Sequence, residues 1–149
     1  MAASAWTFYD SFRRYMADGQ IDLDADEFLM GLFQSTSNAD TITLSVIGSL
    51  TNEVANGSGY LTGGKTLTGI TWSAGAAESV LRFDVTNPIW TATGGNIANI
   101  RYAVIYRNGA SAGIDKMVCK AALTTAQFTL NSGNTLTVTI NSSGVFELS

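Results

Sequence analysis

The side chains that most often do chemistry in proteins are sparse in this chain, and histidine is missing entirely. Without histidine the chain lacks the usual general base, the usual zinc ligand and the usual partner of a serine or cysteine nucleophile. Carboxylates can also do acid–base work, and the one dense acidic cluster runs from Asp22 to Glu27. In an extended strand its three aspartates share one face, which favours a solvated edge that resists strand addition. We therefore predict that the protein is not an enzyme and uses no cofactor or metal.

Two segments match ligand-binding motifs in part. Asp22–Asp26 begins like a calcium loop, yet the glycine after the third aspartate and the later bidentate glutamate are missing. Gly59–Thr66 fits the spacing G-x-x-x-x-G-K-[ST] of a phosphate-binding loop. That chemistry needs a buried parallel strand before the loop and a helix after it, whereas the β-like Leu67–Trp72 follows here. The segment therefore predicts a glycine-rich turn, with Tyr60 as its apolar anchor.

Three other side chains are candidates for binding or reaction. Trp72 alternates with Ile70, which is typical of a core residue. Trp90 follows Pro88 near a turn, so it is the best lead for an exposed aromatic platform that could stack on a sugar. The single cysteine, Cys119, lies in an apolar alternation, which predicts a buried structural thiol rather than a reactive one.

The charge balance argues against several classes of partner. The net charge is −4, and the chain has only eight Lys and Arg residues, too few for a basic patch that neutralises phosphates. We therefore expect no nucleic-acid partner. The apolar runs are far shorter than the roughly twenty residues that span a bilayer, so we expect no membrane partner either. Met1–Trp6 lacks the basic start and apolar core of a secretory signal, which predicts synthesis in the cytoplasm.

The elements that position these residues are mainly strands. An abundance of Thr, Ser, Asn and Gly with a single proline indicates strands and tight turns. Strong helical spacing occurs only in Ala5–Met16, with Ser4 as a plausible N-cap and Gly19 as a plausible stop. We therefore expect an N-terminal helical arm over residues 1–19 and a β-sandwich domain over residues 20–149.

Period-two patterns predict the strands. Ile21–Asp26 reads as an extended segment, and Asp40–Val54 as a long loop with one or two helical turns. Ile100–Arg107 is apolar on both faces, which predicts a buried central strand. Asn131–Asn134 lies between two apolar alternations, which predicts a hairpin. Further strands are expected at Leu81–Val85, Met117–Leu123 and Phe146–Leu148. Strands joined by Gly, Asn and Ser turns predict an all-β fold, an antiparallel β-sandwich or jelly roll with a short N-terminal helix.

Several segments carry a family resemblance. They are Leu50–Asn56, Gly59–Tyr60, Gly63–Leu67, Thr71–Trp72, Arg101–Tyr106, Asn134–Val138 and Gly144–Leu148. In these segments, and over most of the chain from about Asp18 onward, the sequence resembles small virion structural proteins of tailed bacteriophages. The resemblance implies a protein that is made in the host cytoplasm and located on the head surface of the virion, where such proteins commonly form trimers.

The resemblance leads to a hypothesis about function. We expect a capsid decoration (cement) protein that binds the outer head surface and stabilises contacts between major capsid subunits. Its partners would be the major capsid protein and copies of itself, and a low-charge β-sheet surface suits such docking. The alternative is a structural or receptor- or carbohydrate-binding module of the tail, neck or fibre, which predicts an exposed aromatic groove.

The aromatic residues near the N-terminus are the main candidate interface, because aromatic side chains dominate interface energetics. If the helix lies outside the sandwich, it is a docking arm, and deleting residues 1–17 should leave the β domain folded. The other interpretation is that the helix covers an open end of the sheet. The predicted interface residues are Trp6, Phe8, Tyr9, Phe12, Arg13 and Trp90.

Overall fold

The computed structural model describes residues 5–75, 77–109 and 114–149, and strands dominate them. This confirms the predicted all-β fold class. The helical elements are α1 (Asp10–Ala17) and a 3-10 turn at Ile47–Ser49. The strands are β1 (Thr7–Phe8), β2 (Phe28–Phe33), β3 (Lys65–Thr66), β4 (Thr71–Ala74), β5 (Leu81–Asp84), β6 (Ile89–Thr91), β7 (Ile97–Ile100), β8 (Tyr102–Arg107), β9 (Lys116–Ala122), β10 (Phe128–Leu130), β11 (Thr135–Thr137) and β12 (Phe146–Leu148). Neither helix of the described residues has the length and apolar character needed to cross a membrane.

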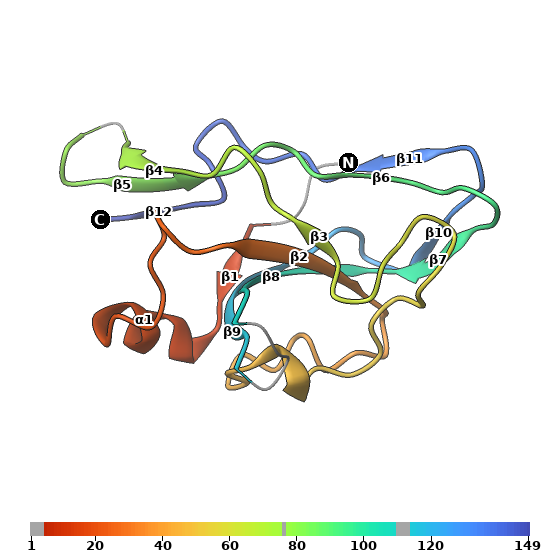
Figure 1. Cartoon of the computed structure of the whole chain (residues 1–149), viewed down its shortest axis with the longest axis horizontal. Coiled ribbons are helices and arrows are strands. Elements are labelled where there is room, and N and C mark those ends of the chain that lie inside the picture. Colours follow the sequence, from red (N-terminus) through yellow and green to blue (C-terminus); the bar gives the residue numbers. More distant parts are fainter. Residues whose placement is uncertain (1–4, 76, 110–113) are drawn as a thin grey trace.

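The strands form two layers. One layer is a five-stranded antiparallel sheet in the order β1-β9-β8-β2-β3, and β7 with β10 extends it beyond the start of β8 (Figure 1). The other layer holds the sheets β12-β5-β4 and β11-β6, which lie above the first in Figure 1. Every strand pair is antiparallel. This arrangement agrees with the predicted antiparallel sandwich.

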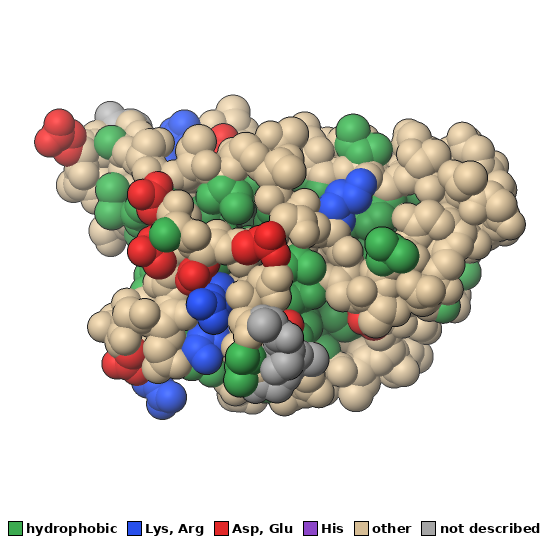
Figure 2. Space-filling model, viewed as in Figure 1, with side chains coloured by type: hydrophobic (Ala, Val, Ile, Leu, Met, Phe, Trp, Pro, Cys, Tyr) green, Lys and Arg blue, Asp and Glu red, His purple; other side chains and the backbone are tan. Residues whose placement is uncertain are grey.

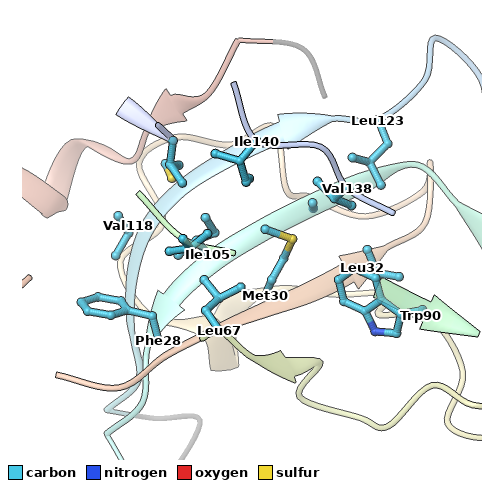
Figure 3. Packing of buried hydrophobic residues seen from close by; sticks show 14 of the residues in the cluster. Phe28, Met30, Leu32, Leu67, Trp90, Ile105, Val118, Leu123, Val138 and Ile140 are labelled. Carbon is cyan, nitrogen blue, oxygen red and sulfur yellow. The ribbon is translucent and has the colours of Figure 1, made fainter. Parts of the chain in front are cut away.

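The main core lies between the layers. Met30 of β2, Ile105 of β8 and Val138, which directly follows β11, point into the same space (Figure 3). β8 is buried on both faces, as its sequence predicted: Ile105 joins the main core, whereas Val104 joins a second cluster on the outer face of the sheet. The loop after β2 covers that second cluster, and the 3-10 turn lies in this loop, as expected for residues 40–54.

The N-terminal segment differs from the predicted helix. Thr7 and Phe8 pair with Lys120 and Cys119 of β9, and the helix begins only at Asp10. Pairing with β9 satisfies the backbone groups of this segment, so a tertiary contact outweighs the helical spacing of its side chains. The predicted N-cap, Ser4, lies outside the described residues, and the residue at the N-cap position is Tyr9.

Aromatic rings join the N-terminal segment to the core. The ring centroids of Phe8 and Phe12 are 5.1 Å apart, and those of Phe8 and Phe146 are 4.8 Å apart. The Phe146 ring in turn stacks on Phe83 at 5.1 Å. Residues 5–17 and the sandwich therefore share one core, and α1 packs against β9.

Two local predictions were wrong. Asn131–Asn134 does not close a hairpin, because β10 pairs with β7 and β11 pairs with β6, so this turn connects the two layers. Residues 21–26 form no strand, because the chain turns at residues 23–25 and bends at residue 26. There an Asp22 carboxylate oxygen accepts the N–H groups of Asp24 and Ala25, a local bond that competes with strand pairing.

Candidate functional site

Three of the predicted interface residues are buried inside this chain. Tyr9 and Phe12 have no exposed surface, and the Tyr9 hydroxyl donates to the carbonyl of Ala39 at 2.8 Å. Trp90 is only 2% exposed, since β6 turns it into the main core. In this fold these three side chains pack in the cores of the chain itself. Trp90 also offers no exposed ring face on which a sugar could stack.

The other three predicted residues reach the surface. Trp6 and Phe8 are half-buried and line a groove of about 630 Å³ between the N-terminal segment and the strand β12. Arg13 is exposed, and its guanidinium carbon lies 5.6 Å from the centre of the Phe8 ring. The structure thus brings Trp6, Phe8 and Arg13 close together and leaves Trp90 in the core.

The acidic run is engaged in contacts within the chain. Asp26 accepts the backbone N–H of Asp22 at 2.8 Å and forms an ion pair with Arg107 at 3.1 Å. The described residues contain no group of three or more side chains placed to hold a metal ion. The run therefore works as a turn that ties the segment before β2 to the end of β8.

The glycine-rich segment is organised around one buried hydroxyl. The N–H of Leu32 donates to the Tyr60 hydroxyl at 2.9 Å, and that hydroxyl donates to a carboxylate oxygen of Glu53 at 2.6 Å. The same oxygen accepts the N–H of Gly63 at 2.7 Å. Burial raises the pKa of Tyr60 above its usual value, which keeps its proton in place as a donor. The strand β3 follows, so the segment is a glycine-rich turn anchored by Tyr60, as predicted.

Replacing Tyr60 with phenylalanine is expected to lower the free energy of unfolding by about 1–3 kcal/mol. The change leaves the Leu32 N–H and the Glu53 carboxylate without their shared partner. Urea unfolding measures the loss. Tyr15→Phe is the matched control, because the Tyr15 hydroxyl makes no hydrogen bond within the described part of the chain. Equal stabilities of the two variants would contradict the anchoring role.

The turn presents an apolar side chain to solvent. Leu61 is 70% exposed and lines a groove beside Lys65 and Thr66, and Ile89 of β6, which is 47% exposed, lines a second groove beside the same two residues. Lys65 is also exposed, donates to the Ile89 carbonyl and places its ammonium 5.8 Å from the centre of the Trp90 ring. We call Leu61, Lys65, Thr66 and Ile89 the β3 surface. Figure 2 shows hydrophobic side chains around a basic one in this region of β3 and β6.

Two shallow grooves flank β3. One, of about 280 Å³, runs between residues 65–68 and residues 86–89, and the other, of about 250 Å³, is bordered by Leu61 and Trp90. Threonine, glycine and apolar side chains make up most of their walls, and Lys65 is the single charged residue in either described lining. Such a surface can bury apolar area and offer main-chain groups to a protein partner.

A second polar cluster lies on the outer face of the sheet. Asp40 accepts hydrogen bonds from the Lys120 ammonium and from the Tyr102 hydroxyl, the latter at 2.6 Å. These two bonds hold the pKa of Asp40 below its usual value, with Lys120 the larger cause. The cluster fastens the loop after β2 to β8 and β9, which is a structural role.

One pattern in the sequence does indicate part of the β3 surface, namely the exposure of Leu61. Leu61 directly follows the anchor Tyr60, and neighbouring residues in extended chain point to opposite sides. Once Tyr60 points inward, Leu61 must point outward. Comparisons of the chain with protein-family models, with curated proteins and with solved structures find no match.

Proposed function

We propose that this protein is a structural component of a bacteriophage particle, a decoration protein that binds the outer head surface and stabilises contacts between major capsid subunits. The observation that carries the proposal is the β3 surface, where Leu61 and Ile89 expose apolar side chains beside an edge strand. Exposed apolar groups gathered in one place are typical of protein-binding surfaces. The resemblance to small virion structural proteins supports the proposal that the partner surface belongs to a phage particle.

The composition of the chain supports permanent docking. Only 13% of the residues are charged, and interface cores are depleted in charged residues because burying them costs desolvation energy. Threonines 66, 68 and 86 instead border the groove beside β3 and can hydrogen-bond across an interface. We also propose that the protein forms trimers on the head surface, and this part of the proposal is based on the resemblance.

Imaging of purified particles by electron microscopy tests this proposal, with the full chain labelled by an antibody. We expect the label to appear in many copies spread over the shell. We also expect the heads of particles made without the chain to break open at a lower temperature than those of complete particles. Label confined to the tail, neck or fibres would overturn the decoration role and favour the alternative role there. Particles without the chain serve as the control for antibody specificity.

A further inference from the structure

The strand β3 is an edge strand with one main-chain side directed outward. On its inner side the N–H of Leu67 donates to the carbonyl of Phe28 at 2.8 Å, and Lys65 lies opposite Met30. In an antiparallel pair, residues with bonds to the partner strand alternate with residues whose N–H and C=O face away. Thr66 therefore directs both groups away from β2. Within the described part of the chain neither group has a hydrogen-bond partner.

The opposite wall of the groove also presents its main chain. β6 bonds to the β11 segment through Pro88, whose carbonyl accepts the N–H of Val138 at 3.0 Å, and through Ala92. By the same alternation the main-chain N–H and C=O of Ile89 point away from β11 and toward β3. The C=O accepts a hydrogen bond from the Lys65 ammonium. The groove closes at residues 68 and 86, where a 2.9 Å main-chain hydrogen bond joins the two walls.

The charge at this groove lacks a counter-charge. Four other basic side chains lie within ion-pair distance of a carboxylate, namely Arg14, Arg82, Arg107 and Lys120. For Lys65 no described carboxylate lies within 4.0 Å, and neither groove lining contains Asp or Glu. On a chain of net charge −4, this exposed ammonium is a local positive site. A carboxylate on a partner would complement it.

We propose that the edge of β3 binds an extended segment of a partner protein by strand addition, with an acidic side chain of that segment at Lys65 and an apolar side chain between Leu61 and Ile89. This inference rests on the proposed function, because it names the surface and the kind of segment through which the protein docks. Main-chain bonds to Thr66 supply affinity, and the acidic and apolar side chains supply specificity.

Nuclear magnetic resonance of the full chain tests the inference, with a capped peptide Ser-Thr-Val-Asp-Val-Thr-Ser as the probe. We expect the peptide to shift the amide resonances of Lys65 and Thr66, and we expect the same peptide with lysine in place of aspartate to bind about fivefold more weakly. Lys65→Met should weaken binding of the acidic peptide about threefold to fivefold. Thr66→Pro removes the outward N–H and leaves the inward main-chain bonds of Lys65 and Leu67 in place, so it should weaken binding about fivefold.

Control variants keep the outcomes separate. Arg14→Glu changes the charge on α1, outside the β3 surface, and should bind like the wild type. Leu61→Ser is a test variant: it removes an exposed apolar side chain of the β3 surface without touching the core, so it should weaken binding of the acidic peptide. Equal binding of the acidic and basic peptides, or shifts confined to the groove at Trp6 and Phe8, would overturn the inference. Binding to purified particles separates the two proposals. If the Lys65→Glu variant coats phage heads as well as the wild type does, the proposed function stands and the inference about β3 is wrong. If the wild-type chain binds the acidic peptide but coats no heads, β3 binds an acidic segment as inferred and the proposed function is wrong.

Discussion

Deletion of residues 1–17 is expected to unfold the chain, which reverses the outcome predicted for a separable N-terminal arm. The deletion removes β1 from the edge of β9 and takes Tyr9 and Phe12, both without exposed surface, out of the core. Truncating one such ring to alanine costs about 3–5 kcal/mol. A domain of this size has a free energy of unfolding of about 5–15 kcal/mol. The loss of several buried rings at once is therefore expected to exceed its total stability.

Far-ultraviolet circular dichroism and a proton–nitrogen correlation spectrum measure this outcome. We expect the truncated chain to lose its cooperative unfolding transition and its dispersed amide resonances. A milder pair of variants gives the same information within the full chain: Phe12→Ala should cost about 3–5 kcal/mol, whereas Arg13→Ala on the exposed side of α1 should cost under about 0.5 kcal/mol. A truncated chain that unfolds cooperatively at the wild-type midpoint would restore the separable arm.

Replacing Gly64 with alanine is expected to lower the free energy of unfolding by about 3 kcal/mol or more. Gly64 has φ +82, where residues with a side chain are strained. An added Cβ would also collide with the carbonyl of Met30 and lie 2.6 Å from the Cα of Gly31, both part of the backbone of β2. Backbone cannot rotate aside as a side chain can, so the whole turn must shift.

Gly133→Ala is the matched control for this variant. Gly133 has a similar φ of +87, but no atom lies within 4 Å of an added Cβ, so only the conformational strain of about 1–2 kcal/mol applies. Urea unfolding of both variants isolates the collision at β2. A Gly64→Ala protein as stable as Gly133→Ala would mean that the turn is free to move away from β2.

Local chemistry was enough to predict the fold class and several strands. The Ile100–Arg107 pattern identified a buried central segment, although the structure divides it after Ile100 into β7 and β8. Cys119 is fully buried as predicted, and burial raises the pKa of its thiol. Alternation, turn residues and apolar faces depend on neighbours in the sequence, so they can be recognised without knowing the partner strand.

What the sequence could not provide is the choice of partners. Thr7 and Phe8 fit a helical pattern, and only the edge of β9 makes them a strand. Asn131–Asn134 has the composition of a hairpin turn, but nothing in it specifies that the flanking strands belong to different layers. The depth of Trp90 is likewise set by the pairing of β6 with β11. Such distant contacts override local preference.

The contact between Phe8 and Phe146 also constrains when the protein can fold. These rings come from nearly opposite ends of the 149-residue sequence, yet their centroids lie 4.8 Å apart in the finished core. During translation the first strand leaves the ribosome long before β9 and β12 exist, so its aromatic side chains stay exposed until Phe146 has been synthesised. Folds dominated by such distant pairings also close slowly. Until Phe146 has been synthesised, chaperones therefore have access to the aromatic side chains of the N-terminal segment that are later buried in the core.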